Sequence, residues 1–202
     1  MIHGVPDIGF IFLIDGSGSM ASERINGVIA AMVIIHEIFK NTNIQHSIVE
    51  HRAIYGKPKL VHNILVDFQH KDEERYNILS LKASEGTREG FSLYWAEKHL
   101  MKSCSSEHKI IIMVSDGAPE HTCDDPIDYV PPVSIKDTAE SAKKIIRRGT
   151  SIVALALDAP DDDVCYRQLK MIYPHVVSCV DIGKFTGQLL HIISKLLQGR
   201  IR

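Results

Sequence analysis

The sequence has no strong excess of charge of either sign. Its 202 residues include 23 Lys and Arg and 25 Asp and Glu, which gives a formal net charge of -2 with neutral histidines. A nucleic acid or an acidic membrane surface as partner generally requires a basic protein surface, and the charge balance supports neither. We therefore expect no nucleic acid and no membrane among the partners of this chain.

Long hydrophobic runs are absent as well. The longest apolar runs, such as residues 10–14 and 110–114, fall far short of the ~20 residues that cross a bilayer. The N-terminal residues lack the basic stretch followed by an apolar one that marks a secretion signal. We expect the chain to work in the cytoplasm, where it is made.

Cysteine is scarce. The four cysteines, Cys104, Cys123, Cys165 and Cys179, form no CxxC pair and have no histidine at zinc-finger spacing. We expect reduced thiols, with Cys104 and Cys179 packed in the interior. Cys123 lies in a polar, loop-like stretch, where a disulfide or reactive thiol is the less favoured alternative.

The hydrophobic pattern favours one α/β domain over residues 1–202. Short β-branched apolar runs alternate with segments of helical period, as in strands joined by crossover helices. The expected strands are residues 8–14, 44–55, 60–68, 110–115, 151–157 and 176–180. Three of these contain continuous apolar runs, so we expect them to be central strands covered on both faces: residues 10–14, 110–114 and 152–157.

Helices are expected between these strands. Apolar residues three or four positions apart, together with Gly149 and Gly199 as C-terminal stops, place helices near residues 25–39, 88–104, 135–146, 164–172 and 185–197. Only residues 56–58, Gly-Lys-Pro, separate the second and third strands, which predicts a hairpin and an antiparallel strand at one edge. No repeat or linker marks the start of a second domain.

A polar motif directly follows the first central strand. Residues 15–20 are Asp-Gly-Ser-Gly-Ser-Met. In open α/β sheets, ligands bind in the crevice beyond the carboxyl ends of strands. Glycines between Asp15, Ser17 and Ser19 would let a tight loop turn these oxygen ligands inward, toward Mg²⁺, Mn²⁺ or Ca²⁺. The motif by itself is equally compatible with helix capping by Asp15 and Ser19.

Two further segments favour the metal interpretation. Asp116 lies in a Ser-Asp-Gly sequence at the end of the apolar strand 110–115. Such a sequence is also an ordinary turn, but its coincidence with a central strand favours a site. Thr87, just before an expected helix, is either an N-cap or a further metal ligand.

Taken in order, Asp15, Ser17, Ser19, Thr87 and Asp116 resemble the metal-ion-dependent adhesion site of von Willebrand factor type A (vWA) domains. The resemblance covers nearly the whole chain. It implies a three-layer Rossmann-like α/β fold, with a mainly parallel six-stranded sheet, one antiparallel edge strand and helices on both faces. It also implies that the three hydroxyls bind a divalent cation, with Mg²⁺ expected and Mn²⁺ or Ca²⁺ as alternatives, while the two carboxylates act directly or through water.

A narrower resemblance concerns residues 86–90, 94–96 and 112–119, which are similar to the C-terminal vWA domain of the cobaltochelatase accessory subunit. This likeness implies a partner within an ATP-driven assembly, such as an AAA+ ATPase that inserts a metal or remodels a metalloenzyme. The chain has no Walker A motif, so the ATPase would be another chain.

The expected function is therefore non-enzymatic. Two carboxylates and three hydroxyls leave a divalent ion electrophilic, so an Asp or Glu of a partner protein could complete its coordination. Self-association, in which a second copy supplies that carboxylate, is a variant of this hypothesis. The alternative is a metal-dependent hydrolase or phosphotransferase, although Ser17 stands where the usual aspartyl-phosphate pattern has a second Asp.

Other polar segments receive mostly structural interpretations. Residues 118–132 should lie over the metal face, as a specificity loop or a solvated insertion. Residues 161–163, Asp-Asp-Asp, are expected to begin a helix rather than to bind a second cation. The 11 histidines are expected mainly on the surface. Trp95 is expected in the core, and the basic residues 143–148 at the C-terminal end of a helix.

Overall fold

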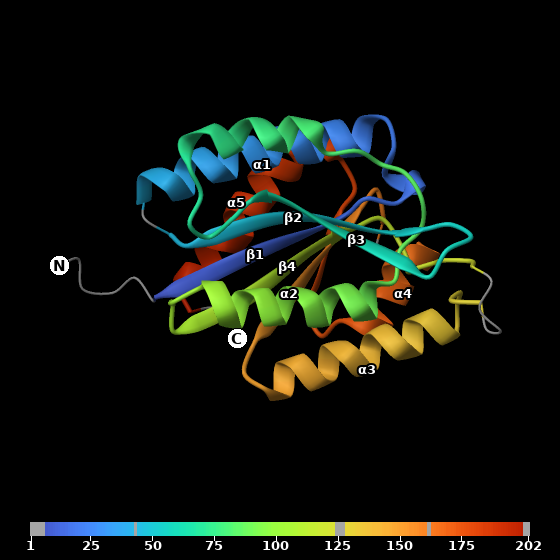
Figure 1. Ribbon diagram of the computed structural model, residues 1–202. Coiled ribbons are helices and arrows are strands. Elements are labelled where there is room, and N and C mark those ends of the chain that lie inside the picture. The colour runs from blue at the N-terminus through green and yellow to red at the C-terminus, as the bar shows by residue number, and fades with distance from the viewer. Residues whose placement is uncertain (1–6, 43, 124–127, 161–162, 200–202) are drawn as a thin grey trace.

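The computed structural model describes residues 7–42, 44–123, 128–160 and 163–199. It contains one six-stranded sheet of order β3-β2-β1-β4-β5-β6 (Figure 1). The strands are β1 (Ile8–Asp15), β2 (His46–Ile54), β3 (Lys59–Val66), β4 (His108–Ser115), β5 (Ser151–Leu157) and β6 (Val176–Cys179). The β2–β3 pair is antiparallel, and the other neighbouring pairs are parallel. The predicted hairpin and mixed sheet are thus confirmed.

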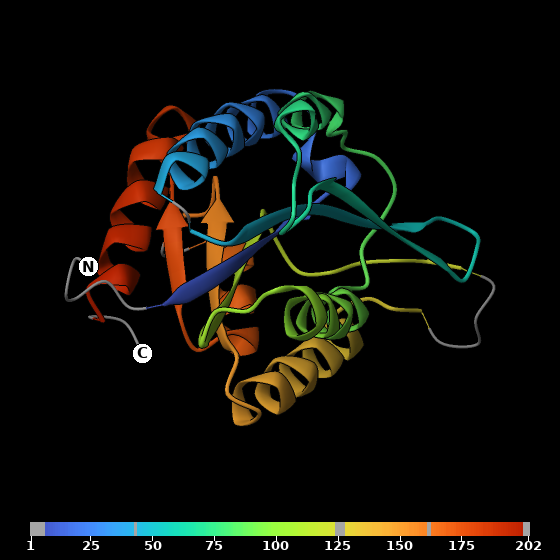
Figure 2. The same cartoon turned by 60° about the vertical axis from the view of Figure 1, so that its left-hand side comes forward.

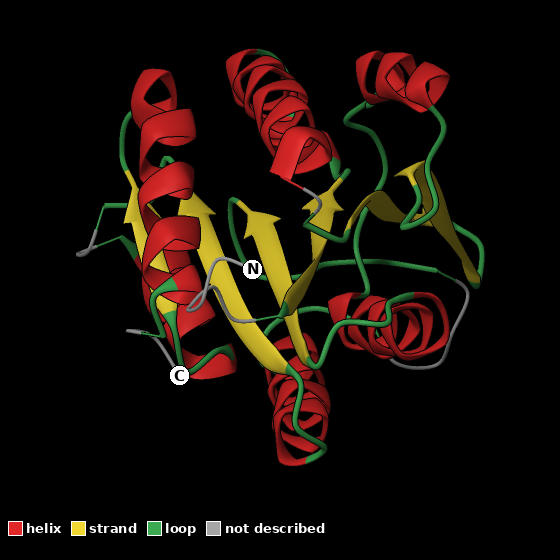
Figure 3. Ribbon diagram, turned by 90° about the vertical axis from the view of Figure 1, so that its left-hand side faces the viewer, coloured by secondary structure: helices red, strands yellow, loops and turns green. Residues whose placement is uncertain are grey.

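Helices cover both faces of the sheet (Figures 2 and 3). The α-helices are α1 (Glu23–Thr42), α2 (Glu89–Ser103), α3 (Val133–Arg147), α4 (Val164–Ile172) and α5 (Phe185–Leu197). Side chains of α1 and α5 share one apolar core, and those of α2, α3 and α4 share the other. The three-layer α/β prediction is confirmed.

Strand β1 shows why the central strands are apolar throughout. Phe10, Phe12 and Ile14 enter the core under α1 and α5. Ile11 and Leu13 enter the core under α2 and α3. Successive side chains of a strand point to opposite faces, so a strand covered on both sides has no position for a solvated residue.

The sequence pattern missed the segment between β3 and α2. A 3₁₀ helix, η2 (Asp72–Ser80), lies there and packs beside α1 through Ile78. Three consecutive acidic residues and isolated apolar ones give it no helical period. Among the described residues, no helix is both long enough and apolar enough to cross a membrane.

The expectation for histidine was wrong at several positions. His36, His46, His51 and His121 are fully buried. The sequence pattern does not distinguish a buried histidine from an exposed one. A neutral imidazole ring can pack in an apolar core like other aromatic rings. Trp95 is half-buried, and its ring stacks on that of His62 with the centroids 4.4 Å apart.

The buried His51 makes stability sensitive to acid. Burial lowers the pKa of His51 from its usual 6.5 to about 3. Below pH 6.5 the unfolded chain protonates this imidazole while the folded protein does not. The free energy of unfolding should therefore fall as the pH is lowered from about 6.5 toward 3, by on the order of 1 kcal/mol per pH unit for this residue.

Urea unfolding of wild type and His51→Leu at pH 7, 6, 5 and 4 tests this expectation. The variant should lose less stability on acidification, because one proton-binding group of the unfolded state is removed. His191→Gln, at an exposed position of α5, should retain the wild-type dependence. A His51→Leu protein with the wild-type acid dependence would contradict the assignment.

Candidate functional site

The site lies where β1 and β4 end. These strands are parallel neighbours, with Ile14 paired to Val114, so Asp15 and Ser115 reach the same edge of the sheet. After Asp15 the chain turns through the short 3₁₀ helix η1 (Gly18–Met20) into α1. Gly16 is needed in this turn, because a Cβ there would lie 2.2 Å from Oε1 of the buried Glu50.

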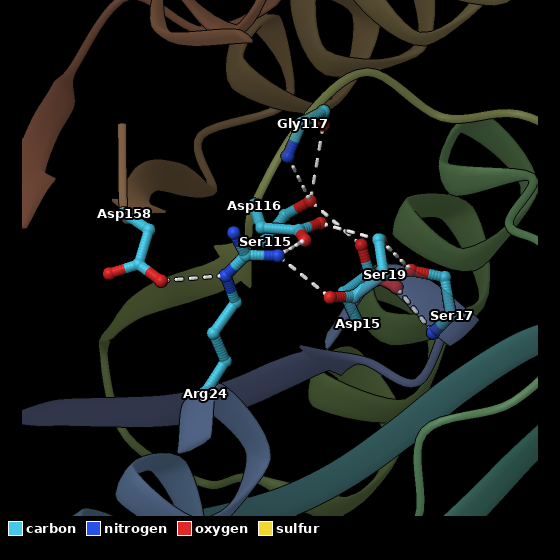
Figure 4. A network of polar contacts seen from close by, with 8 residues as sticks. All are labelled: Asp15, Ser17, Ser19, Arg24, Ser115, Asp116, Gly117 and Asp158. Carbon is cyan, nitrogen blue, oxygen red and sulfur yellow. Dashed lines mark hydrogen bonds and ion pairs between the residues drawn. The ribbon is translucent and has the colours of Figure 1, made fainter. Parts of the chain in front are cut away.

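Four of the five predicted residues are linked by hydrogen bonds (Figure 4). The Ser17 and Ser19 hydroxyl oxygens are 2.9 Å apart. The Ser19 hydroxyl donates to Asp116 Oδ1 at 2.9 Å. The backbone N–H of Ser17 donates to Asp15 Oδ1 at 2.7 Å. Residues 97 positions apart in the sequence thus contribute oxygens to one cluster.

Thr87 reaches the same cleft from a third loop. The loop is fixed by paired backbone hydrogen bonds between Ala53 and Gly86 and by the Thr87 N–H donating to the Glu120 carbonyl. Thr87 is buried and lines the cleft together with the other four predicted residues. The structure therefore gathers all five, with Thr87 on the wall and the other four in the hydrogen-bonded cluster.

The two carboxylates are short of positive charge. Asp15 is almost completely buried, and its Oδ2 accepts a hydrogen bond from the Ser115 hydroxyl at 2.8 Å. Burial raises the pKa of Asp15. Burial, followed by the charge of Asp15, raises the pKa of Asp116. A cation between these carboxylates would offset the free energy that their burial costs.

A third acid lies behind the cluster. Glu89, at the start of α2, is fully buried, and its Oε2 accepts a hydrogen bond from the Tyr173 hydroxyl at 2.8 Å. Burial and then the negative charge of Asp15 raise the pKa of Glu89 to about 8. The interior side of the site thus disfavours the charged form of the Glu89 carboxyl.

Sequence analysis missed Arg24 and Asp158. The guanidinium of Arg24, in the first turn of α1, donates to Asp116 Oδ2 at 2.8 Å and to the Ser19 carbonyl at 2.7 Å. Its Nε donates to Asp158 Oδ2, also at 2.8 Å (Figure 4). Asp158 follows β5, so it lies at the third of three neighbouring strand ends. Its place directly after a predicted central strand could have identified Asp158 from the sequence. Arg24 lies in no recognisable motif.

Arg24 and Asp158, together with the five predicted residues, line a cleft of about 770 Å³. Ala118, Glu120 and Pro131 of the predicted loop 118–132 form part of its wall, as does Tyr55. In the described part of this loop, His121 contacts the end of β2: its Nε2 lies 2.7 Å from the Ile54 carbonyl oxygen. Residues 124–127 of the loop lie outside the described residues.

The remaining predicted positions have structural roles where the structure describes them. Asp163 caps α4 by accepting a hydrogen bond from the Cys165 N–H at 2.6 Å, whereas residues 161 and 162 lie outside the described part. All four cysteines are free thiols, and Cys104 and Cys179 are buried, as expected. The Cys123 thiol accepts a hydrogen bond from Arg88.

Comparisons with known proteins bear on the fold. No protein-family model and no curated protein sequence matches the chain. Among solved structures, the vWF domain of the type V pili tip protein Mfa5 from Porphyromonas gingivalis matches with a TM-score of 0.73 and 13% identity, covering 98% of this chain and 97% of that one. The match thus extends over both chains almost completely.

Two longer proteins contain a similar unit. The pilus adhesin SpaC from Lactobacillus rhamnosus GG matches with a TM-score of 0.73 and 14% identity, covering 96% of this chain but only 31% of SpaC. The PilB minor pilin from Streptococcus sanguinis matches with a TM-score of 0.72 and 16% identity, covering 98% of this chain and 63% of that one. The order of strands, the antiparallel edge and these matches together show that the chain has a vWA-like α/β fold.

Proposed function

We propose that this chain is a non-catalytic protein-interaction domain that binds a divalent cation in the strand-end cleft and, through the cation, an Asp or Glu of a partner protein. The observation that carries the proposal is the convergence of oxygens. The Ser17 and Ser19 hydroxyls and an Asp116 carboxylate oxygen lie in a chain of 2.9 Å contacts at the mouth of an open cleft. Hydroxyl and carboxylate oxygens are the ligands that Mg²⁺ and Ca²⁺ prefer.

The charge balance of the cleft explains why a partner carboxylate would bind. Arg24 already compensates part of the charge on Asp116. A divalent ion held by neutral hydroxyls and partly neutralised carboxylates remains electron-poor, so an additional carboxylate can take an open coordination position. The partner would have to present its acidic side chain into the cleft, whose lining includes Tyr55 and Pro131.

The similar solved structures and the sequence resemblance support different parts of this proposal. Mfa5, SpaC and PilB are described as a pilus tip protein, a pilus adhesin and a minor pilin. Their likeness to this chain supports an interaction role through the fold alone. The resemblance of residues 86–90, 94–96 and 112–119 to the C-terminal vWA domain of the cobaltochelatase accessory subunit favours, as partner, an AAA+ ATPase of a cytoplasmic assembly that inserts a metal or matures a metalloenzyme.

A hydrolase or phosphotransferase is the alternative use of the same residues. It would require Asp15 to act chemically, but Ser17 stands where the usual aspartyl-phosphate pattern has a second Asp. Turnover of a generic phosphate ester that disappears in Asp15→Ala would favour this alternative over an interaction domain.

Cation binding should stabilise the folded protein, because the unfolded chain lacks the assembled site. At a cation concentration of about 100 times the Kd, the expected gain is about 2.7 kcal/mol. Thermal unfolding with Mg²⁺, Mn²⁺, Ca²⁺ or a chelator should show it in wild type and not in Ser17→Ala/Ser19→Ala. The matched control Ser80→Ala/Ser194→Ala, at exposed positions, should respond like wild type. An equal response of both double variants would contradict the site.

Arg24 should oppose cation binding, because its guanidinium shares Asp116 with the ion. We expect Arg24→Gln to bind Mg²⁺ or Mn²⁺ more tightly, by a factor on the order of five, because the pair that partly exposed Arg24 makes with Asp116 is worth about 1 kcal/mol. Isothermal titration measures the change. Arg147→Gln, on the exposed end of α3, should leave the Kd unchanged. Weaker binding by Arg24→Gln would show instead that Arg24 positions Asp116 for the ion.

A further inference from the structure

Three histidines from separate elements meet at the opposite end of the sheet from the cleft. His36 lies on α1, His46 begins β2, and His70 lies between β3 and η2. Their rings form a nearly equilateral triangle, with centroids 5.1, 4.9 and 5.0 Å apart. Each offers a ring nitrogen, and these three nitrogens all lie within 4.8 Å of one another.

The backbone fixes which nitrogen carries the proton in two of the rings. His46 Nδ1 lies 3.0 Å from the Ile44 carbonyl oxygen, and His70 Nδ1 lies 3.1 Å from the Asp67 carbonyl oxygen. A carbonyl only accepts hydrogen bonds, so Nδ1 is the donor in both rings. In the neutral ring the remaining nitrogen, Nε2, carries a lone pair, which in His46 lies 2.9 Å from His36 Nδ1. A histidine that binds a metal typically donates its other N–H to a carbonyl or carboxylate in this way.

The third ring is incompletely satisfied. His36 Nδ1 lies 2.9 Å from His46 Nε2, whereas His36 Nε2 is buried and has no hydrogen-bond partner. His36 and His46 are fully buried, and His70 is half-buried. Burial lowers the pKa of His36, and it lowers that of His46 to about 4. Metals bind imidazole in its neutral form.

We propose that His36, His46 and His70 bind a transition-metal ion, for which Zn²⁺ is the best match. Neutral imidazoles suit Zn²⁺, whereas Mg²⁺ and Ca²⁺ prefer oxygen ligands. In a tetrahedral zinc site with bonds of 2.0–2.1 Å, ligand nitrogens lie about 3.3 Å apart. The three nitrogens, all within 4.8 Å of one another, would move toward that spacing when the ion binds.

This site is separate from the proposed cation cleft. Across the β1–β2 pair, His46 is aligned with Phe10 and His51 with Asp15. The two levels are therefore five residues apart along the strands, which is about 16 Å at ~3.3 Å per residue. The inference does not depend on the proposed function, and either site can exist without the other.

The ion would cross-link three segments of the fold that are far apart in the sequence. It would join the C-terminal half of α1, the first residue of β2 and the segment that leads into η2. Because His70 is half-buried, water or an exogenous ligand could reach the ion as a fourth ligand. A folded-state metal site of this kind stabilises the protein, because the unfolded chain does not hold the three imidazoles together.

Co²⁺ absorption and Zn²⁺ titration of the full chain test the proposal. Tetrahedral Co²⁺ has visible absorption that an octahedral oxygen site barely shows. Wild type and Ser17→Ala/Ser19→Ala should both give this spectrum and lose it to one equivalent of Zn²⁺. His70→Gln, which alters the least buried of the three, should lose more than about 100-fold in Zn²⁺ affinity. His191→Gln should bind like wild type.

A second variant keeps the test independent of folding. His70→Cys replaces one ligand by another and should add a thiolate-to-Co²⁺ charge-transfer band that wild type lacks. Absence of tetrahedral Co²⁺ in wild type, Zn²⁺ binding unchanged in His70→Gln, or bound Co²⁺ without the thiolate band in His70→Cys would each overturn the proposal.

Discussion

The parallel pairing of β1 with β4 is the constraint on which the cleft depends. It aligns Ile14 with Val114, so that the residues following each strand emerge side by side. The Ser115 hydroxyl then bonds Asp15, and the Ser19 hydroxyl bonds Asp116. Each strand is held in the centre of the sheet by apolar residues on both faces. The same burial that stabilises the sheet therefore fixes the positions of the polar groups at its edge.

Burial also sets the electrostatics of that edge. Asp15 and Asp116 are withdrawn from water, which raises the pKa of both. Arg24 supplies the one observed ion pair to Asp116 within the described part of the chain, and it is shared with Asp158. A site with two buried carboxylates and one shared guanidinium favours an additional cation, and an added cation in turn favours an acidic ligand.

Much of this arrangement could be predicted from the sequence. The bounds of β5, α4 and α5 coincide with the predicted residues, because their apolar patterns are strong and Gly199 follows α5. Asp15, Ser17, Ser19, Thr87 and Asp116 could be placed in one cleft, since each directly follows a strand or precedes a helix in a recognisable short motif.

The rest depends on tertiary contacts that no local pattern encodes. Arg24 is an ordinary residue in the first turn of a helix until Asp116 and Asp158 are brought to it. The histidine triangle is drawn from positions 36, 46 and 70, with no metal-binding spacing between them. Its members were expected on the surface because a single histidine in an amphipathic segment gives no sign of burial.

Anomalous diffraction from crystals of this chain soaked in Mn²⁺ tests cation binding in the strand-end cleft most directly. We expect an anomalous peak in the cleft, bonded to the Ser17 and Ser19 hydroxyls, with Asp15 and Asp116 bound directly or through water. A cleft with no peak at saturating Mn²⁺, with Arg24 still paired to Asp116, would contradict cation-dependent recognition by this domain.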